Sequence, residues 1–215
     1  MQQITQRLTA DSPTKWLFYG DSITHGAVHT YGQRDYVELF AERIRHELDR
    51  PDDVIINTAA SGATTRILLA GFDWRVKQFQ PHVVFIMIGT NDCADHHDIN
   101  RAEFEANLHE LIGHITDLPA QPVLQTTCPI LPGGDPSREP HIEDFTDAIR
   151  TVADSRNLPL IDHDQHWRQN GHPHYAWMDD AVHPNAHGHL ALAHKLLHDL
   201  ELHDPASPTC RLFVP

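Results

Sequence analysis

A serine hydroxyl that could act as a nucleophile follows the first apolar run of the sequence. The run WLFY at 16–19 leads into Gly20, and Asp21 and Ser22 come next. A strand-to-helix turn that contains a glycine can expose a side chain and direct backbone N–H groups outward. Ser22 is therefore a candidate nucleophile. The alternative is that Asp21 or Ser22 only caps a helix, which is the more common role of these residue types at a helix start.

A carboxylate and an imidazole stand three residues apart near the C-terminal end. Asp180 and His183 come just before Pro184, and proline is common in the first turn of a helix. With this spacing, Asp180 can accept a hydrogen bond from one ring nitrogen of His183 while the other ring nitrogen faces a nucleophile. The pattern predicts that His183 is a general base and that Asp180 orients it.

Two further segments offer hydrogen-bond donors for an oxyanion. Gly62 lies in AASGAT and Asn91 in GTND, each after an apolar run. The backbone N–H groups of Ser22 and Gly62 and the side-chain amide of Asn91 could stabilise a carbonyl oxygen that becomes negatively charged. Taken singly, Gly62 could be an ordinary loop glycine and Asn91 part of an Asx turn. Asp92 is expected to hold the loop rather than to take part in chemistry.

The elements that would position these residues alternate along the chain. Five apolar runs predict strands, at 16–19, 54–57, 83–88, 123–126 and 158–162. Helical periodicity occurs at 36–48, 66–78, 101–116, 142–155 and 186–200. Because runs such as VVFIMIG are apolar throughout, both faces of the sheet should be covered. The pattern predicts a three-layer α/β/α sandwich with a parallel sheet, in which the candidate residues meet beyond the carboxyl ends of the strands.

Length and composition exclude several classes of protein. A chain of 215 residues fits one domain over 1–215, with a core at about 14–201 and a surface tail at 202–215. Sixteen Lys and Arg against thirty Asp and Glu leave a formal charge of −14. This charge argues against a nucleic acid and against an anionic membrane surface as partners.

Cysteine usage and the N-terminal segment indicate the compartment. The three cysteines, Cys93, Cys128 and Cys210, show no CxxC spacing, so neither a disulfide framework nor a zinc knuckle is expected. The first twenty residues contain no apolar run of signal-peptide length. A cytoplasmic protein is therefore expected.

The four chemical segments together resemble the blocks of the SGNH, or GDSL-like, hydrolase family. They read Gly20-Asp21-Ser22, Gly62, Gly89-Thr90-Asn91-Asp92 and Asp180-Ala181-Val182-His183. The resemblance runs from about Trp16 to Leu200, in family order. It differs only in Ile23, where the motif often has a leucine of similar size. The resemblance implies a flavodoxin-like α/β/α fold with a five-stranded parallel sheet and ester hydrolysis through an acyl-enzyme.

The function expected from these residues is that of a serine esterase acting on small carboxylic esters, with an acetylated sugar as one candidate substrate. A lysophospholipase or acyl-thioesterase is the enzymatic alternative, and a noncatalytic carbohydrate-binding protein of the same fold is a third. Asp21, Trp177 and Tyr175 are candidate substrate contacts, although the two aromatic residues could instead pack beneath the catalytic loop. No cofactor is expected, and the oligomeric state stays open.

No metal is expected either, because the close histidine pairs show no spacing that would complete a tetrahedral set of ligands. They are interpreted as solvated surface residues, namely His96 and His97, His163 and His166, and His172 and His174.

Overall fold

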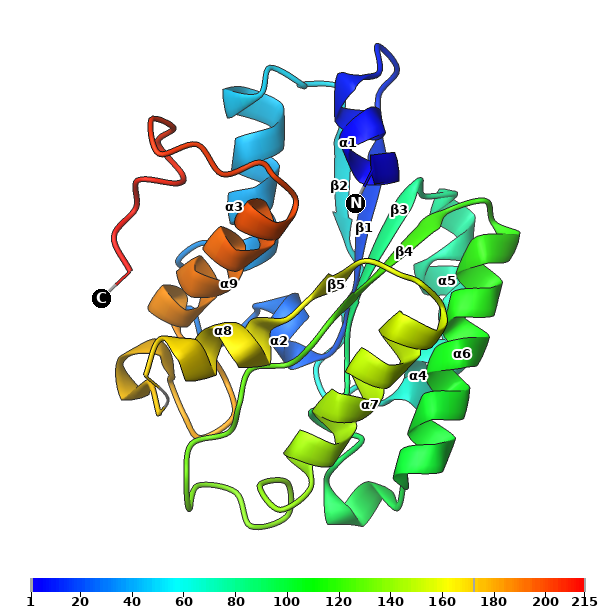
Figure 1. Cartoon of the computed structure of the whole chain (residues 1–215), viewed down its shortest axis with the longest axis vertical. Coiled ribbons are helices and arrows are strands. Elements are labelled where there is room, and N and C mark those ends of the chain that lie inside the picture. Colours follow the sequence, from blue (N-terminus) through cyan, green and yellow to red (C-terminus); the bar gives the residue numbers. More distant parts are fainter. Residues whose placement is uncertain (1, 172, 215) are drawn as a thin grey trace.

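The centre of the protein is a parallel sheet of five strands. The computed structural model describes residues 2–171 and 173–214. Its strands are β1 (Lys15–Gly20), β2 (Val54–Asn57), β3 (Val83–Met87), β4 (Gln121–Gln125) and β5 (Leu160–Ile161). They lie in the order β2-β1-β3-β4-β5, and each neighbouring pair is parallel (Figure 1). The predicted α/β fold with a five-stranded parallel sheet is confirmed.

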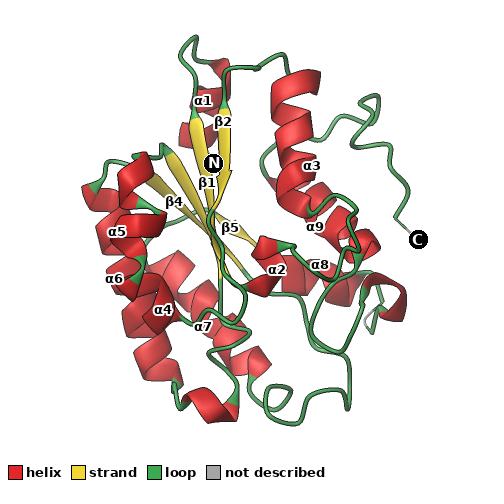
Figure 2. Cartoon of the chain, turned by 180° about the vertical axis from the view of Figure 1, so that it is seen from behind, coloured by secondary structure: helices red, strands yellow, loops and turns green. Residues whose placement is uncertain are grey.

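Helices cover both faces of the sheet (Figures 1 and 2). One layer contains α3 (Tyr36–Glu42) and α9 (Ala186–Asp199), and the other contains α4 (Thr65–Ala70), α5 (Phe72–Arg75), α6 (Arg101–Asp117) and α7 (Ile142–Ser155). The remaining helices are short, namely α1 (Gln2–Thr9), α2 (Ser22–His25) and α8 (His163–Gln169). The three layers follow from strands that are apolar on both faces.

Alternate side chains of each central strand enter opposite halves of the core. On β1, Trp16 and Phe18 pack in the half that contains α3 and α9, whereas Leu17 and Tyr19 pack in the half that contains α4 to α7. This division follows from the two-residue period of a strand. Because both faces of the sheet are packed against apolar layers, the strand ends that carry the functional loops are held in place.

Several predicted boundaries differ from the structure. The helix predicted at 66–78 is divided into α4, α5 and a short 3-10 turn, because Gly71 lies between α4 and α5. The helix predicted at 36–48 continues as a π-helical turn, η1 (Arg43–Glu47), beyond α3. The strand predicted at 158–162 shortens to β5, since Asn157 has a positive φ of 51° and Pro159 has no N–H for the ladder.

Two helices, α1 and α8, were not predicted from the sequence. Each carries few apolar residues, and α8 (HDQHWRQ) buries Trp167 as its one large apolar side chain. Helices of seven and eight residues are shorter than the stretch over which helical periodicity can be recognised. Asp162, whose side chain accepts from the N–H of Gln165 at 2.9 Å, begins α8 as its N-cap.

The segment after α9 packs back against η1, and it buries Leu202 and Cys210 in the core, so it is not only the surface tail that was predicted. Glu47 accepts from the N–H and from the Oγ1 hydroxyl of Thr209, at 2.7 and 2.6 Å. Arg43 donates to the carbonyl oxygen of Leu202 at 2.9 Å. These bonds attach the predicted tail to the layer formed by α3 and α9. Within the described residues, no helix combines the length and the apolar character needed to cross a membrane.

Candidate active site

Ser22 is presented by a tight turn between β1 and α2. Gly20 ends β1 so close to β3 that a Cβ there would clash with the carbonyl oxygen of Met87. Asp21 then caps α2 by accepting the N–H of Ile23 at 3.0 Å. Gly26 ends the helix at a φ of 66°, which favours glycine. The partly exposed Ser22 therefore begins a one-turn helix at the carboxyl end of the sheet.

Asp21 itself lies inside the protein. Its side chain is fully buried, and this burial raises the pKa of Asp21 to about 7. The expectation that Asp21 contacts substrate is therefore wrong, because no part of the residue reaches the surface. The capping alternative describes its position instead.

Ser22, His183 and Asp180 form a continuous hydrogen-bonded row. The Oγ of Ser22 lies 2.9 Å from Nε2 of His183. Nδ1 of His183 lies 2.9 Å from Oδ2 of Asp180 and 3.1 Å from Oδ1. Because the carboxylate can only accept, Nδ1 carries the ring proton and Nε2 is left to accept from the serine. This geometry suits a general base acting on a hydroxyl nucleophile.

The turn that carries Asp180 and His183 is held by its own backbone. Asp180 Oδ1 accepts the N–H groups of Val182 at 2.8 Å and of His183 at 2.7 Å. Burial alone would raise the pKa of Asp180, but these two bonds and the bond from the His183 ring outweigh it and leave the pKa below its usual value. The carboxylate is thus kept ionised beside the imidazole.

Asn91 and the loop of Gly62 lie together at the same end of the sheet. The buried Asn91 donates from Nδ2 to the carbonyl oxygen of Ala63 at 3.0 Å. Gly62 precedes Ala63 in an exposed turn with a φ of 76°, a conformation that L side chains rarely adopt. The amide of Asn91 has a second N–H to offer, and the backbone of Gly62 is open to an approaching group.

Asp92 anchors the loop next to Asn91. It is fully buried and accepts both the N–H and the hydroxyl of Thr65, at 2.8 and 2.6 Å. Burial raises the pKa of Asp92 to about 6. These bonds join the loop after β3 to the start of α4, so Asp92 supports the position of Asn91.

The comparison with protein families agrees with this arrangement. A family model described as the GDSL-like lipase/acylhydrolase family matches residues 18–191. The chain belongs to this family. The matched residues contain Ser22, Gly62, Asn91 and the Asp180–His183 pair. The family resemblance seen in the sequence is therefore confirmed.

Among characterised relatives, this GDSL-like hydrolase is 27% identical over 212 residues to an acetylxylan esterase of Geobacillus stearothermophilus, covering 88% of this chain and 94% of that protein. A 78-residue stretch is 38% identical to an uncharacterized protein of Mycoplasma pneumoniae. That stretch is 36% of this chain and spans only 9% of the Mycoplasma protein.

Solved structures show the same fold. The crystal structure of the Geobacillus acetylxylan esterase superposes with a TM-score of 0.74 at 26% identity, covering 88% of this chain and 94% of that one. An alpha/beta hydrolase enzyme from the metagenome of Lake Arreo, Spain, superposes at 0.77 with 25% identity, covering 91% and 98%. The structures of the Geobacillus enzyme include catalytic mutants in which a serine, an aspartate or a histidine is replaced.

Arg138 joins the site of this GDSL-like hydrolase from the loop at 131–140. Its Nε donates to the carbonyl oxygen of Thr90 at 3.0 Å, and its Nη2 donates to Oδ1 of Asn91 at 3.3 Å. Arg138 was not singled out from the sequence. No local signal could have found it, since an arginine in a polar loop is common.

The two expected aromatic contacts differ in exposure. Trp177 is only 5% exposed. It packs edge-on against Trp167 at 4.8 Å between ring centroids and stacks on His174 at 3.8 Å. The packing alternative therefore describes the surroundings of Trp177, and its contact with substrate stays a prediction. Tyr175 is 65% exposed and remains a candidate.

A second histidine, His29, lies against His183. The His29 ring stacks on the His183 ring with centroids 3.9 Å apart and planes 7° from parallel. Its Nδ1 lies 2.7 Å from Oδ2 of Asp179. Tyr31, 76% exposed, donates its hydroxyl to Oδ1 of the same carboxylate at 2.8 Å. Neither His29 nor Tyr31 was singled out from the sequence.

Within the part of the chain that the structure describes, one group of three side chains is close enough to share a cation. His29, Asp180 and His183 each offer a ligand atom within 4.8 Å of the others. The two imidazole planes are nearly parallel, so their in-plane lone pairs run side by side and do not converge on one ion. Both Nδ1 atoms face carboxylates instead.

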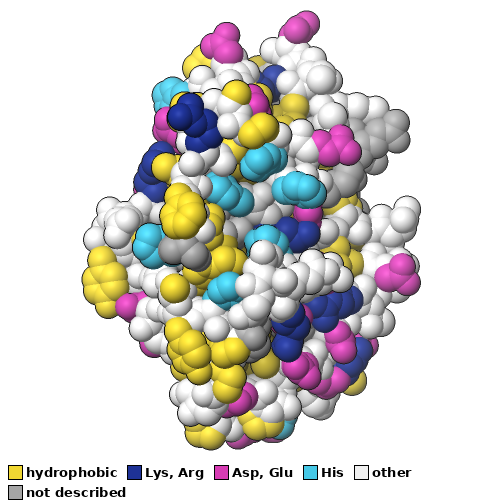
Figure 3. Space-filling view, turned by 60° about the vertical axis from the view of Figure 1, so that its left-hand side comes forward, with side chains coloured by type: hydrophobic (Ala, Val, Ile, Leu, Met, Phe, Trp, Pro, Cys, Tyr) yellow, Lys and Arg dark blue, Asp and Glu magenta, His cyan; other side chains and the backbone are white. Residues whose placement is uncertain are grey.

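Other histidines gather on the face that Figure 3 shows. Of the expected pairs, His163 is buried and bonds to Gln125 at 3.0 Å, so it is not a surface residue. Burial lowers the pKa of His163 to about 3. His172 lies outside the described residues.

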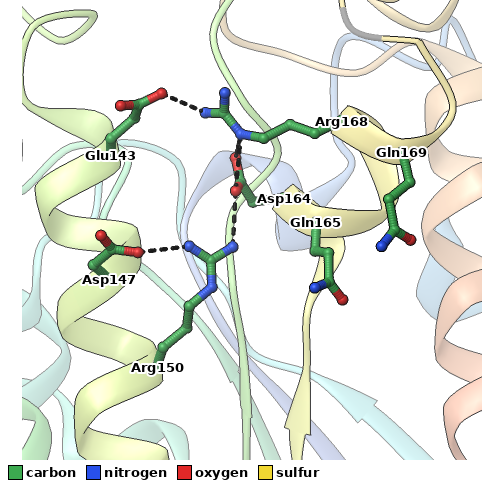
Figure 4. A pocket seen from close by; sticks show the side chains of 7 residues that line it. All are labelled: Glu143, Asp147, Arg150, Asp164, Gln165, Arg168 and Gln169. Carbon is green, nitrogen blue, oxygen red and sulfur yellow. Dashed lines mark hydrogen bonds and ion pairs between the residues drawn. The ribbon is translucent and has the colours of Figure 1, made fainter.

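A polar cavity of about 450 Å³ lies between α7 and α8, apart from the triad (Figure 4). Its two arginines are already paired. Arg150 contacts Asp147 and Asp164, at 2.7 and 2.8 Å. Arg168 contacts Glu143 at 3.0 Å and Asp164 at 2.9 Å. Because each guanidinium is held by carboxylates, neither is free to bind an anionic ligand.

Proposed function

We propose that this protein is a serine esterase that hydrolyses small carboxylic esters through an acyl-enzyme, and that its substrate is an O-acetylated carbohydrate. The observation that supports the esterase activity is the row of contacts from Ser22 through His183 to Asp180, with 2.9 Å between the two atoms of each contact. The reaction needs no cofactor, because every group that it uses belongs to the chain.

In the first half-reaction, Ser22 Oγ attacks the ester carbonyl carbon while Nε2 of His183 takes the hydroxyl proton. The carbonyl electron pair moves to oxygen, and the resulting oxyanion accepts from the N–H groups of Ser22 and Gly62 and from the amide of Asn91. The C–O bond to the alcohol then breaks. His183 gives its proton to the leaving alcohol, and the acyl group stays on Ser22.

In the second half-reaction, water replaces the alcohol. His183 takes a proton from the water as its oxygen attacks the acyl carbon, and the same donors hold the second oxyanion. When the bond to Oγ breaks, the proton returns to Ser22 and the carboxylic acid leaves. The ionised Asp180 stabilises the imidazolium that exists during each step.

Two observations support a carbohydrate ester as substrate. The relatives with a stated activity include an acetylxylan esterase. Exposed aromatic side chains include Tyr31, which donates to Asp179, and Tyr175, four residues before Asp179 in the sequence. Exposed rings can stack on the apolar face of a sugar while polar groups around them bind its hydroxyls. Both tyrosines thus suit a sugar better than a long alkyl chain.

Hydrolysis of p-nitrophenyl acetate by the wild type and by Ser22→Ala tests the esterase activity. The wild type should turn over, and Ser22→Ala and His183→Ala should each lose several orders of magnitude in kcat. The double variant should be scarcely slower than either single variant, because the residues act as a unit. If Ser22→Ala kept more than about a tenth of wild-type turnover, Ser22 would not be the nucleophile.

A comparison of acyl chains and sugars tests the substrate class. We expect kcat/KM to fall from acetyl to octanoyl p-nitrophenyl esters and acetylated xylo-oligosaccharides to be deacetylated. An apolar groove would instead add about 0.8 kcal/mol for each buried methylene. A clear octanoyl preference with inert sugars would move the assignment to a lysophospholipase or acyl-thioesterase. Sugar binding without any hydrolysis would indicate a noncatalytic binding protein.

A further inference from the structure

The catalytic imidazole of this protein is covered on one face by a second imidazole. His29 comes from the loop between α2 and α3, and its ring lies 3.9 Å from that of His183 with only 7° between the planes. We propose that His29, held by Asp179, is a positioning residue that stabilises the protonated state of His183 during acyl transfer. This inference rests on the proposed esterase function.

Asp179 holds His29 and is itself held by Tyr31. One carboxylate oxygen binds Nδ1 of His29 at 2.7 Å and the other accepts the Tyr31 hydroxyl at 2.8 Å. These two bonds lower the pKa of Asp179, so the carboxylate remains ionised. The backbone N–H of Asp179 also donates to the carbonyl oxygen of His183 at 2.9 Å. Asp179, which anchors His29, is therefore tied to the backbone of His183, and His183 is the residue on which His29 stacks.

The result is two carboxylate–imidazole pairs side by side. Asp180 binds His183 and Asp179 binds His29, and the two acids are neighbours in the sequence. Only His183 reaches Ser22. The side chain of His29 is 24% exposed, and Nδ1 of its ring is 4.0 Å from Asp180. This distance exceeds that of a hydrogen bond, so the stacked faces are the direct contact between His29 and His183.

Stacking matters most when His183 is charged. A His29 ring that carries only the Nδ1 proton, donated to Asp179, is uncharged, and the face of an uncharged aromatic ring attracts a cation. During catalysis His183 becomes an imidazolium when it takes the proton from Ser22 or water. A contact that strengthens at that moment stabilises the transition state more than the bound ester, and it raises kcat without lowering KM. The same contact limits rotation of the His183 ring away from Ser22.

The decisive variants separate the ring of His29 from its polar atoms. His29→Ala removes the stacked face, whereas His29→Phe keeps a flat aromatic face without a bond to Asp179. Asp179→Ala releases His29 but leaves its ring in place. His46→Ala, at an exposed histidine in η1, is the matched control. Titration of active sites with a fluorophosphonate allows kcat to be expressed for each functional serine.

With p-nitrophenyl acetate, His29→Ala should lower kcat by about tenfold, within the range of a cation–π contact, and change KM by less than about twofold. His29→Phe should recover kcat to within about threefold of wild type. Asp179→Ala should fall between these two variants, and His46→Ala should match the wild type.

Two results would overturn the inference. Either His29→Ala has wild-type kcat, or His29→Phe is as slow as His29→Ala, in which case the stacked face is not what matters. Failure of the proposed function looks different, because the wild type itself would then show no hydrolysis that depends on Ser22. Thermal unfolding of each variant identifies any loss that comes from a damaged fold.

Discussion

Arg138 donates from Nη2 to the side-chain oxygen of Asn91 at 3.3 Å. The guanidinium is itself fixed, because Nη1 contacts Asp135 at 2.6 Å and Nε donates to the carbonyl oxygen of Thr90 at 3.0 Å. Because Oδ1 of Asn91 accepts from Arg138, the amide has a fixed orientation, and its NH2 end points away from the loop that carries Arg138. The NH2 end is left for Ala63 and for an oxyanion, as the proposed mechanism requires.

Replacing Arg138 should therefore weaken the oxyanion contact without removing it. Loss of a whole donor costs about 100-fold to 1,000-fold in kcat, so we expect Arg138→Gln to lower kcat by about tenfold to 100-fold. KM for p-nitrophenyl acetate should change little. Steady-state kinetics provide the check. The control is Arg156→Gln, at an arginine that contacts the backbone of α6. Wild-type kcat in Arg138→Gln would show that Asn91 needs no such partner.

Asp21 should make stability depend on pH. Burial raises its pKa in the folded protein from 3.8 to about 7, so folding favours the protonated carboxyl. The stabilisation is complete below the unfolded pKa and is lost as the pH rises through the folded one. Asp21→Asn keeps a capping side chain that cannot ionise. The free energy of unfolding of Asp21→Asn minus that of the wild type should therefore rise between pH 4 and pH 8, by at most on the order of 4 kcal/mol.

Urea unfolding of the wild type and Asp21→Asn at pH 4, 6 and 8 measures this difference. Asp52→Asn, at an exposed position, should show none. A difference between wild type and Asp21→Asn that stays constant with pH would mean that the buried carboxyl does not change its protonation in this range.

Tyr31 should affect sugars more than small esters. Its ring is 76% exposed while its hydroxyl is bound to Asp179, so the ring is presented at a fixed place beside the triad. A lost aromatic contact of about 1 kcal/mol corresponds to a KM roughly fivefold higher for an acetylated xylo-oligosaccharide. We expect this from Tyr31→Ala, with little change in KM for p-nitrophenyl acetate.

Tyr31→Phe separates the ring from its anchor, and it should keep most of the sugar affinity. Trp74→Ala removes a ring of similar exposure, 74%, from α5 in the opposite helical layer, and should have no effect on either substrate. Equal KM values for the sugar in Tyr31→Ala and the wild type would exclude a role for this ring in binding.

Chelation should leave turnover unchanged. The proposed steps use the hydroxyl of Ser22, the imidazole of His183 and N–H donors, and none of them requires a Lewis acid. The measurement is kcat/KM before and after dialysis against EDTA. Activity that disappears in EDTA and returns with one equivalent of a divalent metal would contradict the mechanism.

The sequence by itself determined those features that depend on neighbouring residues. The apolar runs predicted the central strands because a strand covered on both faces must be apolar along its length. The three-residue spacing of Asp180 and His183 predicted their contact because both lie in one turn. Ser22, Gly62 and Asn91 were singled out as candidates because each follows a strand whose carboxyl end faces the same edge of a parallel sheet.

Only the tertiary structure decided the features that depend on loops from distant parts of the chain. Arg138 reaches Asn91 across 47 residues and His29 reaches Asp179 across 150, and no periodicity connects such positions. The burial of Asp21 and Trp177 was equally out of reach, because the same residue types occur at the mouths of active sites. A local pattern states what a residue is able to do, whereas the packing around it decides whether the residue meets substrate or the core.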